Sequence, residues 1–225
     1  MIPLRDTIKS RTVPFVNYAL ITLCGVVFLY ELSLGAKVGH FIRLTGVTAS
    51  DVSASLLRGH FAARPALTLF SSLFVHGGWM HLLGNMLYLY IFGDNVEDRI
   101  GHGSYLVFYL LCGAASALVQ VYAEQGSTAP LIGASGAISG VLGAYLLLYP
   151  GAKVLTLIPL FIFFPVVEVS AFFFLGFWFL LQFVQGALAS AGGDAAMGGV
   201  AWWAHAGGFV AGAVLLPVFL LLRRL

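Results

Sequence analysis

Long apolar segments, separated by short groups of charged residues, are the feature that most restricts the fold of this chain. Hydrophobic residues make up 60% of its 225 residues and charged residues only 9%, and the mean hydropathy is +0.97. A soluble domain of this length needs far more polar surface than such a composition provides. The composition therefore predicts an integral membrane protein.

The charged residues divide the chain into six apolar spans, most of them close to the roughly 20 residues that a helix needs to cross the hydrocarbon core. We predict an all-α membrane protein with a single domain over residues 1–225. It is expected to be a six-transmembrane-helix bundle that follows a short tail at 1–12. The expected helices are 13–35, 76–93, 104–123, 134–149, 168–189 and 200–222.

Lysine and arginine residues near the span ends predict the orientation of the bundle. Arg5, Lys9 and Arg11 precede the first span, and Arg223 and Arg224 follow the last. Positive residues close to span ends are retained on the cytoplasmic side. Both termini are therefore expected in the cytoplasm, with the bundle in a bacterial cell (inner) membrane.

Two connecting segments are expected to have structure of their own. The segment at about 35–65 becomes a long first extracytoplasmic loop, and its length exceeds that of ordinary connections. We expect interfacial helices there. Residues 154–165 are rich in β-branched and aromatic residues and include Pro159, which favours an extended or re-entrant segment over a helix.

Several function classes are disfavoured by the sequence. The net charge of +2 is small and scattered, so nucleic acid is not expected as a partner. Cys24 and Cys112 lie in apolar spans and form neither a disulfide framework nor a CxxC site. The sequence has no HExxH pattern and no carboxylate cluster at membrane depth, so no metal or other cofactor is expected.

Polar residues occur near the beginning of each even-numbered span. His81 and Asn85 lie near the start of the second span, Ser135 at the start of the fourth, and His205 near the start of the sixth. Even-numbered spans run in the same direction, from outside to inside, so these residues share one depth below the outer surface. Polar groups are costly inside a membrane and usually have a function.

These residue types suit nucleophilic catalysis. A serine hydroxyl is a poor nucleophile until a base removes its proton, and an imidazole is the side chain suited to that task. Ser135 in the first turn of a helix also places backbone N–H groups where negative charge would develop on an attacked carbonyl. Asn85 and His81, one turn apart, add side-chain donors. No acidic residue lies at that depth, so the sequence predicts a Ser135–His205 dyad.

Glycines accompany both members of this pair. Gly136 and Gly140 are four residues apart, and Gly208 and Gly212 share one helix face with His205. Small residues let two membrane helices approach closely. We therefore expect the fourth and sixth spans to be in contact.

Structural interpretations of the same residues remain open. Small-xxx-small patterns are common in membrane helices, so the glycines around Ser135 are also explained by helix packing. His205 follows Trp202 and Trp203, which is typical of an interfacial aromatic belt. His81 and Asn85 also fit an interhelical hydrogen bond. The common depth of the four residues is what favours catalysis.

The chain resembles the rhomboid family of intramembrane serine proteases. The resemblance rests on the GASG segment, the AHAGG segment, the HGGWMHLLGN segment and the six-span layout with a long first loop. It implies Ser135 as nucleophile, His205 as general base, and Asn85 and His81 as oxyanion contacts. Some family members have an aromatic residue four positions after the serine that stacks on the histidine, and here that position is Ser139. The remaining motif positions are Gly133, Gly208 and Gly212.

The resemblance also implies a reaction and its partners. We expect hydrolysis of peptide bonds within or next to transmembrane segments of other proteins, through an acyl-enzyme, with membrane lipid as surroundings and no obligate partner. The fifth span is a hypothetical gate for substrates, and the loop 191–199 a hypothetical lid. An inactive rhomboid-like binder of transmembrane segments is the alternative. A channel or transporter is disfavoured because no chain of ionisable residues crosses the membrane.

Overall fold

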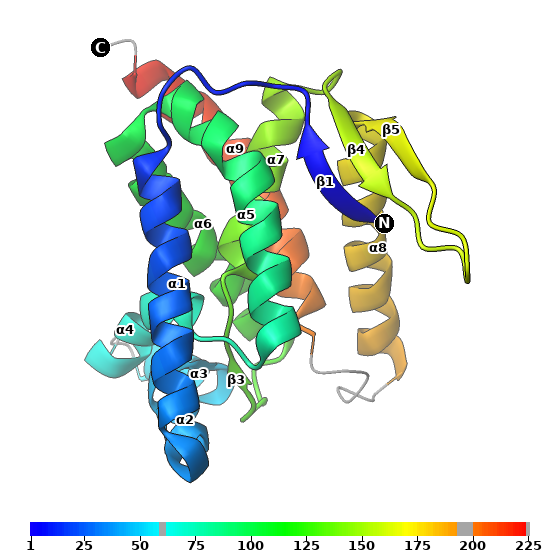
Figure 1. The fold of residues 1–225 in the computed structure, drawn as a ribbon. Helices are drawn as coiled ribbons and strands as arrows, with labels where there is room; N and C mark the ends of the chain where they lie inside the picture. Colours follow the sequence, from blue (N-terminus) through cyan, green and yellow to red (C-terminus); the bar gives the residue numbers. More distant parts are fainter. Residues whose placement is uncertain (59–61, 193–199, 224–225) are drawn as a thin grey trace.

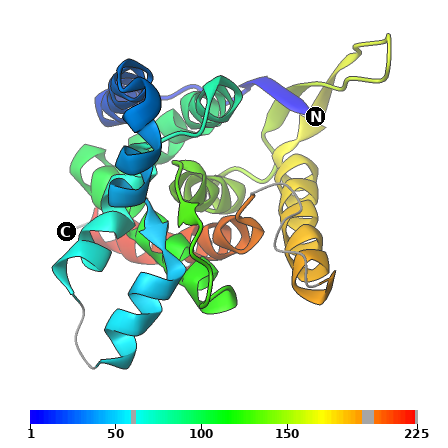
Figure 2. The same cartoon turned by 90° about the horizontal axis from the view of Figure 1, so that it is seen from below.

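The computed structural model describes residues 1–58, 62–192 and 200–223, and long helices dominate it (Figure 1). Viewed along the bundle, α7 lies in the middle and α8 at the edge (Figure 2). The main helices are α1 (Phe15–Ser33), α5 (Trp79–Ile100), α6 (His102–Ala123), α7 (Ser135–Leu148), α8 (Ala171–Gly192) and α9 (Trp202–Leu222). The expected class, a helical membrane protein, is confirmed.

Four of these helices, α1, α6, α8 and α9, are long and apolar enough to cross a membrane. Helix α5 qualifies together with α4 (Ala63–Ser71) and the short 3-10 turn η2 (Ser72–Phe74), as a pair bent by 83°. Helix α7 has only 14 residues, fewer than the roughly 20 needed for a full crossing. A count of six spans therefore stays a prediction.

Helix α5 is longer than the expected span 76–93, since it continues to Ile100 through a charged segment. Glu97 in this segment is fully buried. Its carboxylate accepts the main-chain N–H groups of Val16 and Asn17 at 3.1 and 2.7 Å. The first N–H groups of a helix have no partner within it, so Glu97 caps α1. The helix therefore continues beyond the expected span 76–93, because this carboxylate has partners in the fold.

A small sheet adds strands to the expected all-α fold. Its antiparallel strands, in the order β1-β4-β5, are β1 (Ile2–Asp6), β4 (Lys153–Leu157) and β5 (Val166–Ser170). Strand β4 confirms the expected extended conformation after residue 154. Strand β1 lies in the tail 1–12, for which no strand was predicted, and β5 moves the start of α8 from the expected 168 to Ala171.

The first loop contains short helices, as expected for a segment of this length. They are η1 (Gly35–Lys37), α2 (Val38–Thr45) and α3 (Ala49–Leu57), followed by α4. A two-residue strand β2 (Val47–Thr48) pairs with β3 (Pro130–Leu131) just before α7. The loop is thereby joined to the segment that leads into α7.

Helix α7 is the core of the bundle. Every residue from Gly136 to Tyr145 is buried, because α6 and α9 cover it on two sides. A Cβ on Gly208 or Gly212 of α9 would meet the main chain of Gly136 or Gly140 of α7. The α7 and α9 backbones are therefore in direct contact.

The glycines of α7 differ from expectation in one respect. A Cβ on Gly140 would meet Cys112, and one on Gly136 would meet Ser116, both on α6. These two glycines thus make room for α6, whereas Gly208 and Gly212 make room for α7. Three backbones approach one another at this point.

Candidate active site

Helices α5, α7 and α9 begin at the same end of the bundle, the lower end in Figure 1. Ser135 is the first residue of α7, His205 lies in the first turn of α9, and His81 lies in the first turn of α5. The common direction of the three helices brings these residues to one level.

The side chains of Ser135 and His205 are in hydrogen-bond contact. The distance between Ser135 Oγ and His205 Nε2 is 2.8 Å, although 70 residues separate them in the sequence. The contact depends on the glycine-mediated approach of α7 and α9. It also depends on Gln120 of α6, whose buried amide oxygen accepts the N–H of Ala204 at 2.9 Å and so fixes the start of α9.

Gln182 of α8 is a site residue that the sequence analysis missed. Its side chain is buried, and its Oε1 lies 2.7 Å from His205 Nδ1. With the amide oxygen facing Nδ1, the neutral imidazole carries its proton on Nδ1 and leaves Nε2 free to accept from Ser135. An amide in an otherwise apolar span is itself a signal of function, and that signal was available in the sequence.

Asn85 and His81 lie beside the Ser135–His205 pair. Within the described part of the chain, Asn85 Nδ2 is buried without a hydrogen-bond partner. The Gly77 N–H points to His81 Nδ1 at 3.4 Å, which leaves the proton of the neutral ring on Nε2. Both side chains therefore present unused N–H donors, the arrangement that an oxyanion requires.

Gly133 is required at its position for two reasons. Its φ of +117° is a conformation that L side chains rarely adopt, and a Cβ there would lie 2.6 Å from His81 Nε2. Its N–H donates to the Ser72 carbonyl at 2.9 Å. The chain can therefore turn into α7 close to the His81 ring.

A cavity of about 250 Å³ lies between α5, α7, α8 and α9, and it is lined by the side chains of Ser135, His205, Gln182, Asn85 and His81. Beyond the residues already described, its walls include Met80, Tyr88, Ile138 and Leu142. In the described residues, no group of three or more His, Cys, Asp and Glu side chains is arranged to hold a metal ion.

Aromatic rings lie near the His205 imidazole, but they come from other chain positions than the resemblance implies. Ser139 takes the position four residues after Ser135 and donates to the Ser135 carbonyl at 2.6 Å. The ring centroids of Trp178 and Trp202 lie 6.0 and 6.4 Å from that of His205. Helix α8 therefore supplies both a ring and an amide to this histidine.

The hypothetical gate and lid differ in how far the structure describes them. The aromatic residues of α8 face both ways: Phe172, Phe173 and Phe177 are exposed, whereas Phe174 is buried. The proposed lid falls almost entirely on 193–199, which lies outside the described residues.

Comparison with known proteins agrees with the fold. The model of the rhomboid domain matches residues 63–222. "Rhomboid protein 1, mitochondrial" of Saccharomyces cerevisiae is 33% identical over 40% of this chain and 27% of its own length. "Rhomboid protease GlpG" of Klebsiella pneumoniae is 28% identical over 63% of this chain and 46% of its own length. "RHOMBOID-like protein 5" of Arabidopsis thaliana is 35% identical over 35% of this chain and 25% of its own length.

The helices, and the cavity at one end of them with its buried polar side chains, define a multi-pass integral membrane protein with an internal site. The family match covers most of the chain, so this protein belongs to the rhomboid family. The matched stretches span less than half of each of these curated relatives.

Proposed function

We propose that this protein is an intramembrane serine endopeptidase that acts on transmembrane segments. The observation that carries the proposal is the 2.8 Å contact between Ser135 Oγ and His205 Nε2 inside a cavity of a rhomboid-family bundle. A nucleophile and a base at hydrogen-bond distance are the minimum requirement for serine catalysis.

In the proposed reaction, His205 Nε2 takes the hydroxyl proton while Ser135 Oγ bonds to the carbonyl carbon of the substrate. The C–N bond then breaks, the leaving amine receives that proton from His205, and an acyl-enzyme remains on Ser135. Water, deprotonated by His205, attacks the ester and releases the carboxylic acid, and the serine regains its proton.

The negative oxygen of the tetrahedral intermediate requires donors that are already in position. Ser135 begins α7, whose first N–H groups have no side-chain cap, so the Ser135 N–H and the helix N-terminus point toward this oxygen. The unpartnered Asn85 Nδ2 and His81 Nε2 complete the proposed oxyanion site.

Gln182 takes the place that an aspartate has in soluble triads. Its amide oxygen orients His205 and selects the tautomer with a free Nε2. Because an amide is neutral, it stabilises the imidazolium less than a carboxylate does. We therefore assign Gln182 as a positioning residue.

Substrates of this site are proposed to be membrane-spanning helices that approach from the side. A helix hides its carbonyls in internal hydrogen bonds, so the segment must unwind before attack. Residues with low helix propensity or small side chains near the cut are therefore favoured. Helix α8, at the edge of the bundle (Figure 2), is the proposed gate.

The proposed orientation places residues 1–12 and Arg223 on the cytoplasmic side of a bacterial cell membrane. The basic residues Lys9, Arg11, Arg99 and Arg223 all lie around one cavity at the upper end of the bundle. Basic residues directly next to the helix ends on this side support this orientation, because they weigh more than those in long loops.

A serine-directed fluorophosphonate tests the proposal in detergent. We expect the wild type to be labelled on Ser135 and Ser135→Ala to remain unlabelled. His205→Ala is expected to react at least about 100-fold more slowly, because the general base is absent. Equal labelling of Ser135→Ala would contradict the proposal, and an unlabelled, folded wild type that still binds a transmembrane peptide would favour the inactive binder.

Gln182→Leu is expected to lower kcat by about 10- to 100-fold with little change in KM. The expected loss is smaller than the roughly 10⁴-fold effect of altering the aspartate of a Ser-His-Asp triad, because Gln182 is uncharged. Gln182→Glu keeps an oxygen acceptor and is expected to recover most of the activity. Rates of peptide cleavage at several substrate concentrations separate kcat from KM.

Gln185→Leu is the matched control for this prediction, since Gln185 lies on the same helix and is exposed. It is expected to leave kcat within about threefold of the wild type, as usual for exposed positions. If Gln182→Leu and Gln185→Leu have the same kcat, Gln182 has no positioning role.

A further inference from the structure

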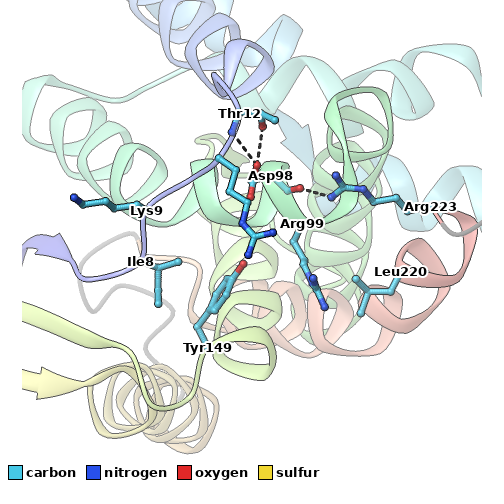
Figure 3. A pocket seen from close by; sticks show the side chains of 9 residues that line it. Ile8, Lys9, Thr12, Asp98, Arg99, Tyr149, Leu220 and Arg223 are labelled. Atoms are coloured by element: carbon cyan, nitrogen blue, oxygen red, sulfur yellow. Dashed lines mark hydrogen bonds between the residues drawn. The ribbon is translucent and has the colours of Figure 1, made fainter.

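A second cavity, of about 580 Å³, lies at the opposite end of the bundle from Ser135. Figure 3 shows its walls, which come from the segment before α1 and from the ends of α5, α7 and α9. Lys9, Arg11, Arg99 and Arg223 contribute the positive charges. Asp98 contributes the negative one.

The carboxylate of Asp98 is already engaged. Its Oδ1 accepts the N–H and the hydroxyl of Thr12 at 3.0 and 2.8 Å. Arg223 donates to the main-chain carbonyl of Asp98 and not to its carboxylate (Figure 3). In the described residues, the side chains of Lys9, Arg11 and Arg99 form no ion pair with any carboxylate.

Four cationic groups and one carboxylate therefore leave an excess of three positive charges around one cavity. Tyr149 lies among these charges: Arg11 and Arg99 act on its side chain electrostatically, as do the carboxyl groups of Asp98 and Asp94. Positive charges that line one cavity repel one another, and a bound anion would offset this repulsion. Guanidinium groups match phosphate oxygens with paired N–H donors.

The orientation of the bundle explains why basic residues lie at this end, but not why they converge. Residues from three separate segments, represented by Arg11, Arg99 and Arg223, reach one cavity. The apolar side chains of Ile8 and Leu220 complete its wall. The cavity lies where three apolar helices end, the depth at which lipid headgroups occur, and basic pockets at such positions bind anionic headgroups.

We propose that this cavity binds a phosphate-bearing anion through Arg11 and Arg99, with Tyr149 and Arg223 beside them. An anionic phospholipid headgroup and free phosphate share this chemistry. The apolar edge and the position of the cavity favour the lipid. Binding is independent of the proposed peptidase activity, so the two proposals can fail separately.

Thermal unfolding of the purified protein in detergent tests this site. At about 100 times the dissociation constant, dioctanoyl phosphatidylglycerol is expected to raise the wild-type Tm by about 5 °C. The zwitterionic dioctanoyl phosphatidylcholine is expected to have a much smaller effect. In Arg11→Gln/Arg99→Gln, the concentration needed for half of the shift is expected to rise on the order of 30-fold.

Two further variants separate binding from folding. Lys37→Gln/Arg43→Gln removes two exposed charges from the first loop and is expected to respond like the wild type. Arg11→Lys/Arg99→Lys keeps both charges in the cavity and is expected to retain part of the shift.

Inorganic phosphate at constant ionic strength forms the second arm of the test. A shift by phosphate alone that is lost in Arg11→Gln/Arg99→Gln would support the site and identify free phosphate as its ligand. The proposal would be overturned by a shift that persists in this variant, by an equal shift with phosphatidylcholine, or by no shift with either anion.

Discussion

Replacing Ser135 by alanine is expected to lower kcat for cleavage of a transmembrane substrate by about 10⁴- to 10⁶-fold. The proposed acyl-enzyme cannot form without Oγ. Any residual rate would come from the oxyanion donors and from substrate binding alone. Gel separation of the substrate and its fragments, with the wild type and the variant in the same detergent, measures this effect.

The losses of kcat in variants of Ser135 and His205 are expected not to add. Ser135 and His205 are in direct contact, so residues acting as one unit should not give additive losses. We expect His205→Ala and the double variant with Ser135→Ala to be about as slow as Ser135→Ala. Ser104→Ala on α6 is the control and should retain activity. Double-variant losses that equal the product of the single losses would show that the two residues act independently.

Replacing Gly212 by valine is expected to have the largest effect on stability. The new Cβ would meet the main chain of Gly140, and a helix backbone cannot move aside as a flexible side chain does. Helices α7 and α9 must separate, at a cost of about 3 kcal/mol or more, and the Ser135–His205 contact is lost with them. Thermal unfolding in detergent and the cleavage assay are expected to show both losses.

Gly25→Val provides the matched control for this substitution. Gly25 lies in α1, and a Cβ there has nothing within 4 Å. The change is therefore expected to shift stability by less than about 1 kcal/mol, mainly through helix propensity. Equal unfolding temperatures for Gly25→Val and Gly212→Val would show that the α7–α9 contact does not limit stability.

The position of the candidate site could be inferred from the sequence because direction alternates along a helical membrane protein. Once the spans are assigned, the starts of the second, fourth and sixth all fall at one end. His81, Asn85, Ser135 and His205 lie at those starts. The Ser135–His205 distance of 2.8 Å depends in addition on glycines, whose spacing is visible in the sequence.

Gln182 could not be placed in the same way. Span length and direction specify how deep a residue lies, but not how its helix is rotated about its own axis. That rotation decides whether Gln182 or Gln185 faces His205. It is set by the contacts of α8 with its neighbours, such as the packing of Phe179 against Phe209 of α9, with ring centroids 4.7 Å apart.

The end of α5 and the small sheet were also beyond sequence analysis. A charged residue normally indicates the end of a span. Glu97 does not end its helix, because its carboxylate has buried hydrogen-bond partners. Its main-chain partners, the N–H groups of Val16 and Asn17, are about 80 residues away. Strand β1 likewise forms only because β4 is beside it. Pairings between distant segments leave no periodic pattern in either segment.

Composition and the order of apolar spans by themselves determined that this chain is a helical membrane protein and at which end its polar residues gather. These properties follow from the transfer of side chains and backbone from water to lipid, which depends on local sequence. Only the tertiary structure decided which atoms meet: Gln182 with His205, and Arg11 and Arg99 around one cavity. Such contacts depend on helix rotation and on long-range packing, which no local segment encodes.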